Sequence, residues 1–254
     1  RQRQMCIRDS AGSQSVYSRP TDMGGSDGVT DNYSISSYNN VQYHTAADMI
    51  PFGGSFKIGY APDLDAYGSG NNAGPTQTEG TAAYVGRSAT QYQVSFDAIP
   101  FLDGVKIGAD YMEFDKQGDE GKKDQEAESG AYYATFATGP VSVGFSQAYR
   151  AELLEDASII ASDKTTNIAY YDQVNYSIAF AASDDLSVSY EQEKSEAVKQ
   201  DNDQTSVEQK STAVQIAYTM GGMTLALSHA SHDNVGYVTG ENQDQTLLAV
   251  TMAF

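Results

Sequence analysis

The chain closes with Leu248-Ala249-Val250-Thr251-Met252-Ala253-Phe254, and this stretch decides the fold class. Large apolar side chains occupy every second position, and the last residue is aromatic. This alternation is the period of a β-strand with one apolar face. A soluble sheet buries such a face in a core, whereas an outer-membrane barrel turns it toward lipid and places aromatic residues at the interface. The stretch therefore predicts a final strand belonging to one of these two classes.

Length and composition agree with both classes. A chain of 254 residues suffices for one large all-β domain or one membrane barrel. Its mean hydropathy of -0.47 is polar, but an average does not exclude a barrel, whose lipid-facing residues are hidden by alternation. The 18 Tyr and 9 Phe, with no Trp, suit a strand-rich chain whose interfacial aromatic residues are mainly Tyr.

The first ten residues, RQRQMCIRDS, resemble a translated sequencing adapter, so we expect Arg1 to Ser10 to be a non-native scar. Without them, Lys+Arg falls from 15 to 12 and Asp+Glu from 34 to 33, and the net charge moves from -19 to about -21. The single cysteine, Cys6, also lies in the scar. Such a charge argues against nucleic acid as a partner and against adhesion to anionic membrane surfaces. An acidic soluble protein would share it.

Period-two alternation recurs along the chain and predicts eleven strands. Every second connection between them is tight, and the others are long, acidic and rich in Gly, Asn or Gln. A meander with short turns at one end and long loops at the other is typical of a bacterial outer-membrane barrel. The predicted strands include these segments: 40–46, 56–60, 90–96, 105–111, 141–145, 174–180, 186–190, 214–218, 223–227 and 248–254.

The opposite faces of these strands carry small and polar residues, which suit a water-filled lumen and fill a protein core poorly. A two-layer sandwich would show the same alternation with its polar face outward. Examples of the polar faces are Gln91, Gln93 and Ser95; Ser142, Gly144 and Ser146; and Gln173, Asn175 and Ser177.

At this point the chain resembles the Gram-negative general diffusion porins, which are sixteen-stranded trimeric outer-membrane barrels. The resemblance lies in NNVQYHTAADMIPFGGSFKIGYAPD (39–63), GVKIGADY (104–111) and LLAVTMAF (247–254). It implies an all-β antiparallel transmembrane barrel of which about eleven strands are present and the N-terminal strands are missing. Residues 11–37 would then be the infolded constriction loop, and 38–254 the C-terminal barrel strands. Residues 11–37 could equally be a disordered end of the chain, because their Gly and Ser content suits both.

The resemblance further implies passive diffusion of small hydrophilic solutes and ions, sieved by pore diameter and by the field of charges at the constriction. Acidic loops predict a modest cation preference. The residues expected at the constriction are Arg19, Asp22, Asp27 and Asp31 from the loop, and Lys57, Arg87, Lys106 and Arg150 from the wall.

The resemblance also implies partners and orientation. The complete protein is expected to be a homotrimer in outer-membrane lipid and lipopolysaccharide, with long loops extracellular and the C-terminus periplasmic. The final strand, through Leu248, Val250, Met252 and Phe254, is expected to be the signal that the barrel-assembly machinery reads.

Enzymatic chemistry is not predicted, and neither is a cofactor or a metal site. Ser228 and His229 are adjacent on a strand and point to opposite faces, so they cannot form a nucleophile and base pair. Asp201-Asn202-Asp203 begins like a calcium loop but lacks the Gly and Glu that such a loop needs. Two further function classes stay open: a non-conducting structural or adhesive barrel, and an acidic soluble β-sandwich.

Overall fold

The computed structural model describes residues 33, 35, 40–46, 49–62, 88–115, 127–151, 168–200 and 205–252. Eleven strands form one sheet in which each strand pairs antiparallel with its neighbours in sequence. Their bounds are β1 Val41–His44, β2 Ser55–Ala61, β3 Ala89–Phe96, β4 Val105–Phe114, β5 Glu128–Thr138, β6 Val141–Ala151, β7 Ile168–Ala181, β8 Leu186–Lys199, β9 Val207–Met220, β10 Met223–Asp233 and β11 Gln243–Met252. A short 3-10 turn, η2 (Val235–Tyr237), lies between β10 and β11. The predicted eleven-stranded antiparallel meander is confirmed.

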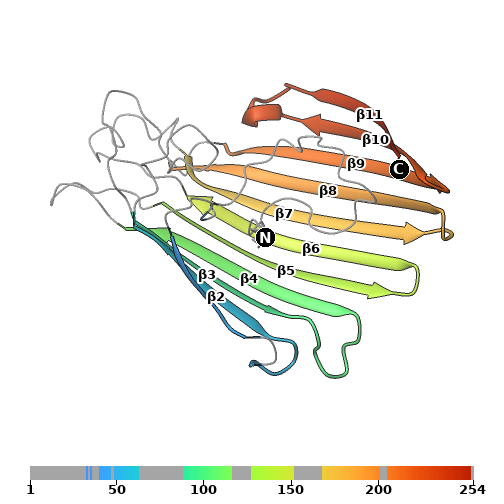
Figure 1. Cartoon of the computed structure of the whole chain (residues 1–254). Helices are drawn as coiled ribbons and strands as arrows, with labels where there is room; N and C mark the ends of the chain where they lie inside the picture. Colours follow the sequence, from blue (N-terminus) through green and yellow to red (C-terminus); the bar gives the residue numbers. More distant parts are fainter. Residues whose placement is uncertain are drawn as a thin grey trace.

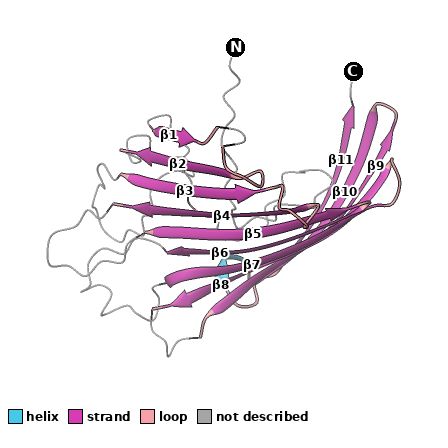
Figure 2. Cartoon of the chain, turned by 90° about the horizontal axis from the view of Figure 1, so that it is seen from below, coloured by secondary structure: helices cyan, strands magenta, loops and turns pink. Residues whose placement is uncertain are grey.

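The sheet is twisted and strongly curved, and β1 and β11 form its two edges (Figures 1 and 2). Among the described strands, β1 and β11 pair with each other nowhere. The sheet is therefore open, as expected of a barrel of which only part of the strands is present. No helix in the described ranges is long and apolar enough to cross a bilayer.

Tight connections alternate with longer ones, as predicted. β5 and β6 are joined by Gly139 and Pro140, and β9 and β10 by Gly221 and Gly222. Gly139 has a φ of 52° and Gly221 a φ of 57°, a region that favours glycine, because a Cβ there would crowd the following carbonyl. At the opposite end of the sheet the connections run 62–88, 115–127, 152–167, 200–206 and 234–242. At the end with the tight turns, the connections 45–54 and 97–104 are of intermediate length. The two ends of the sheet thus differ as they do in outer-membrane barrels.

Most strands are longer than the predicted segments. The clearest case is the pair of segments 186–190 and 214–218: β8 continues to Lys199, and β9 begins at Val207. β10 likewise continues to Asp233. The prediction failed because it took loss of apolar alternation as the end of a strand, whereas the backbone ladder also continues with polar side chains on both faces.

The two faces of the sheet differ in chemistry. The face that carries Tyr92, Ile178, Ile216 and Leu225, which we call the outer face, exposes large apolar side chains along every strand from β1 to β11. Exposed members are Val41, Tyr43, Tyr60, Tyr92, Ile107, Tyr132, Phe136, Phe145, Tyr176, Ile178, Phe180, Tyr190, Val214, Ile216, Tyr218, Leu225, Leu227, Leu248, Val250 and Met252. An apolar surface of this extent needs a hydrophobic environment. The opposite, inner face is described next.

Candidate functional site

The inner face is built from polar residues in register across the strands. One row runs through Ser146 on β6, Asn175 on β7, Glu193 on β8, Ser211 on β9 and His232 on β10. All five are buried. The Asn175 amide donates a hydrogen bond to Ser146 Oγ at 3.2 Å, and His232 Nδ1 lies 2.9 Å from Ser211 Oγ. Hydrogen bonds of this kind satisfy polar groups along the wall.

Closer to the tight turns, the inner face carries smaller residues. The next rows toward the turns include Ser142, Ala179, Ser189, Gln215 and Ser228, followed by Ser187, Ala217, Ala226 and Ala249. Short side chains on an inward-facing wall are typical of a barrel that encloses a lumen. This agrees with the predicted lumen-facing positions.

Three of the predicted basic residues lie on the inner face. Lys57 on β2 is opposite Gln93, which is opposite Asp110. Lys106 on β4 is opposite Thr135 of the inner face, and Arg150 on β6 is opposite the buried Ser129. These three residues therefore lie on the inner face; their role at a constriction stays a prediction. Five other predicted residues lie outside the described ranges: Arg19, Asp22, Asp27, Asp31 and Arg87.

Two acidic residues of the inner face were missed. Glu191 and Glu193 on β8 are 4% and 1% exposed and follow Ser187 and Ser189 in the same phase of alternation. Glu193 lies beyond the predicted strand segment 186–190. The signal that could have found it was the continued alternation itself, with Tyr190 outward and Glu191 inward. The described wall thus contains acidic as well as basic groups.

Tyr33 and Ile35, which precede β1 in the chain, lie against the inner face. The Tyr33 amide donates a hydrogen bond to Ser129 Oγ, and the Ile35 amide donates one to Gln91 Oε1, each at 3.1 Å. Their side chains join a buried apolar cluster with Met112 and Phe114. Tyr33 and Ile35 belong to the predicted infolded loop of residues 11–37. The other residues of that loop lie outside the described ranges.

The connection between β10 and β11 also lies against the inner face. Tyr237 of η2 stacks on Tyr171 of β7, with ring centroids 4.9 Å apart. Its hydroxyl lies 2.7 Å from Ser195 Oγ on β8, and the Gly236 amide donates a hydrogen bond to Gln209 Oε1 on β9 at 2.8 Å. Figure 2 shows η2, in cyan, beside β7 and β8. The sequence placed a loop here, but nothing in it indicated that the loop turns inward.

One row of side chains, which we call the aromatic belt, connects Tyr33 with Tyr237 across the inner face. It consists of Phe114, Tyr33, Arg150, Tyr171 and Tyr237. Tyr33 packs edge-on against Phe114 of β4, with ring centroids 5.1 Å apart. Arg150 Cζ lies 4.4 Å from the centre of the Tyr33 ring, a cation–π contact. Arg150 is the register partner of Tyr171, which in turn stacks on Tyr237. The belt therefore crosses the inner face from β4 to β8 near the end that carries the long connections.

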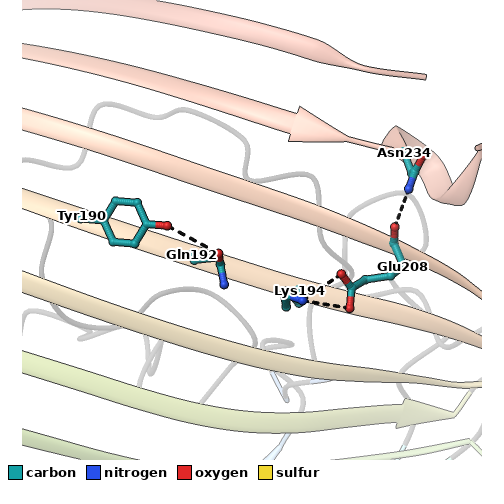
Figure 3. Close-up of polar contacts among 5 residues, drawn as sticks. All are labelled: Tyr190, Gln192, Lys194, Glu208 and Asn234. Carbon is teal, nitrogen blue, oxygen red and sulfur yellow. Dashed lines mark hydrogen bonds and ion pairs between the residues drawn. The ribbon is translucent and has the colours of Figure 1, made fainter. Parts of the chain in front are cut away.

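The outer face becomes polar near the same end of the sheet. On β8, Tyr190 is followed outward by Gln192 and Lys194 (Figure 3). Lys194 Nζ lies 3.0 Å from Glu208 Oε1 of β9 in a half-exposed salt bridge. The Asn234 side-chain amide donates a hydrogen bond to the Glu208 carbonyl at 2.8 Å (Figure 3). The apolar band of the outer face is thus bounded by charged residues, as at the edge of a membrane.

The terminal strand has the predicted alternation. Leu248, Val250 and Met252 lie outward opposite Leu227, Leu225 and Met223 of β10. Their side chains are 67%, 51% and 54% exposed, more than those of their partners on β10, because β11 has a neighbouring strand on one side only. Phe254 lies outside the described residues. The role of these four residues in barrel assembly stays a prediction.

Two pairs of serine and histidine residues bear on possible catalysis. Ser228 is buried on the inner face and His229 is bonded outward to Thr246, so this pair is separated as predicted. The sheet, however, brings Ser211 and His232 from different strands to 2.9 Å, which adjacency in sequence could not show. A hydroxyl and an imidazole in hydrogen-bond reach are the start of a nucleophile and base pair.

Comparison with known proteins gives a similarity of structure but none of sequence. No protein-family model matches the sequence, and no curated protein matches it. The solved structure of OmpT (in-vitro folded), an outer membrane protein of Vibrio cholerae, is similar with a TM-score of 0.48 and 11% sequence identity. The similarity covers 83% of this chain and 60% of that one. The chain therefore spans about 60% of the length of the structure it matches.

One prediction is corrected by these findings. The sequence analysis predicted no enzyme, but one fold can carry enzymes as well as channels. The fold therefore does not exclude an enzyme. The separation of Ser228 and His229 does not exclude one either, because Ser211 and His232 lie within hydrogen-bond distance. The structure establishes an antiparallel meander of outer-membrane-barrel type, with an apolar outer face and a polar inner face.

Proposed function

We propose that this chain forms the wall of an outer-membrane porin that lets small hydrophilic solutes and ions diffuse passively. The observation that carries the proposal is the opposite chemistry of the two faces of each strand. On β9, for example, Ile216 and Tyr218 are outward and exposed, whereas Gln215 and Ala217 are inward and buried.

The outer face has dimensions that suit a bilayer. On β9 the outward apolar residues run from Val214 to Met220, a stretch of roughly 20 Å along a strand. The apolar band of an outer-membrane barrel is about 25 Å tall. A soluble sandwich would instead bury these side chains in a core, and they are exposed here. Folding in water without detergent tests the soluble sandwich. The proposed porin should not fold under these conditions.

The inner face suits a water-filled lumen. Its rows consist of Ser, Ala, Asn and Gln, and Lys57, Lys106 and Arg150 lie on the same face as Glu191 and Glu193. Charges of both signs on a lumen wall create the field through which ions are selected. A structural or adhesive barrel would need a lumen closed by large side chains, and the smaller residues near the tight turns argue against it.

Reconstitution of the complete protein in planar bilayers tests the proposal. We expect stepwise, ohmic current increments on insertion. Folded protein that inserts without current would overturn the porin and favour the structural barrel. Reversal potentials across a KCl gradient test the cation preference that the acidic loops predict, and a chloride preference would contradict it.

The proposal includes partners and an orientation. The complete protein would be a homotrimer in outer-membrane lipid and lipopolysaccharide, with its long loops extracellular and its C-terminus periplasmic. Cross-linking in isolated outer membranes tests the trimer. The barrel-assembly machinery would read Leu248, Val250, Met252 and Phe254, so Phe254→Ser should lower the amount of folded protein in the outer membrane, whereas the inward substitution Thr251→Ser should not.

A further inference from the structure

We propose that the connection 234–242 is a latched constriction of the lumen, held against the wall by Tyr237. The inference rests on the proposed porin function and deepens it, because it names the element that sets the bore on the β7 to β9 side. It concerns a different part of the chain from the constriction loop expected at residues 11–37.

Three strands hold the latch. Tyr237 stacks on Tyr171 of β7 at 4.9 Å, and its hydroxyl lies 2.7 Å from Ser195 Oγ of β8. The Gly236 amide donates to Gln209 Oε1 of β9 at 2.8 Å. Tyr171, Ser195 and Gln209 are all buried on the inner face. The loop therefore projects over the wall of the lumen instead of extending the barrel outward.

The start of the loop is shaped to make this inward turn. Asn234 has a φ of 55° and a ψ of 47°, the left-handed conformation that Asn tolerates better than most residues. Its side chain accepts a hydrogen bond from the Gly240 amide at 2.9 Å and donates one to the Glu208 carbonyl at 2.8 Å. One residue thus ties both ends of the turn to β9.

Tyr237 itself has a φ of 59°, which a residue with a large side chain rarely adopts. Such a conformation persists where surrounding contacts hold it. The ring stacking and the hydroxyl contact with Ser195 are the contacts available for this purpose. The latch is consequently fixed in place by tertiary contacts and not by local preference.

Single-channel recording of the complete protein tests the latch. Tyr237→Ala removes both the ring and the hydroxyl, and we expect unitary conductance to rise about 1.5-fold, because current scales with the open section at the narrowest point. Larger sugars should also permeate faster. Tyr237→Phe and Ser195→Ala remove the same hydrogen bond, so each should increase open-channel current noise, and combining them should add nothing further.

Tyr190→Ala is the matched control, because Tyr190 is an exposed tyrosine on the outer face of β8. Its conductance should equal that of the wild type. Folding of each variant is checked by the heat-dependent mobility of the barrel on gels. Should Tyr237→Ala fail to fold, Val238→Cys in a Cys6→Ser background replaces it. Val238 is 53% exposed in the same loop, and its reaction with a bulky charged thiol reagent should lower the conductance.

The outcomes separate the two proposals. A conducting wild type with unchanged Tyr237→Ala conductance overturns the latch alone, as does modification of Val238→Cys without effect on current. A wild type and a Tyr237→Ala variant that are both folded and both silent overturn the porin and the latch together.

Discussion

Arg150 Cζ lies 4.4 Å from the centre of the Tyr33 ring, and this contact joins a segment that precedes β1 to the inner wall at β6. Arg150 was predicted as a wall residue of the lumen, and the structure shows that its side chain also covers a docked segment. Arg150 can therefore contribute to the charge of the lumen wall and, by holding Tyr33 against the wall, to the width of the lumen.

Replacing Arg150 with Ala should loosen the docked segment. A cation–π contact of this kind is worth about 1 kcal/mol, which corresponds to about a 5-fold change in the docking equilibrium. In a Cys6→Ser background, a cysteine placed at Ile35 should react with a thiol reagent about 5-fold faster in Arg150→Ala. Arg150→Lys, which keeps the charge and loses the planar group, should lie between the two. Equal labelling rates in all three proteins would show that the contact does not hold the segment.

Gly108 should not tolerate a side chain. A Cβ at this inner position would overlap the ring of Tyr133, which lies across it from β5. Gly108→Val should lower the free energy of unfolding by about 1–3 kcal/mol, the usual cost of overpacking. Urea unfolding in detergent measures this. Tyr133→Ala should rescue most of the loss in the double variant, and a loss that is additive instead would place its cause elsewhere.

The two faces of β10 should respond in opposite ways to a charge. Leu225→Lys places an ammonium on the outer face and should cost about 2–4 kcal/mol in a bilayer. Ala226→Lys places it on the inner face beside Ala217 and Ala249, where it should cost under about 1 kcal/mol because the lumen is hydrated. Unfolding in lipid vesicles measures both. A cost at Ala226 equal to or above the cost at Leu225 would contradict this assignment of the two faces.

The salt bridge between Lys194 and Glu208 should contribute little to stability. Its side chains are 34% and 48% exposed, and such pairs are typically worth under about 1 kcal/mol. A double-mutant cycle with Lys194→Gln and Glu208→Gln should give a coupling energy in this range that shrinks with added salt. A coupling of several kcal/mol, insensitive to salt, would indicate that this part of the sheet is shielded from water.

Several features could be predicted from the sequence because they depend on local pattern. Alternation of apolar and polar residues at a period of two separates the outer from the inner face of each strand, and it placed Lys57, Lys106 and Arg150 inward correctly. Glycine-containing tight turns marked one end of the sheet. The pattern failed where both faces become polar, so the ends of β8, β9 and β10 and the inward direction of Glu193 were missed.

The sequence alone predicts the antiparallel meander of eleven strands and, wherever apolar and polar residues alternate, the face on which a residue lies, because a strand's periodicity and its turns are local properties. Which residues from distant strands and loops meet depends on the tertiary structure. The inward turn at Tyr237, the docking of Tyr33 under Arg150 and the approach of His232 to Ser211 depend on strand register and sheet curvature. These contacts join residues tens of positions apart in the chain, and no local pattern encodes them.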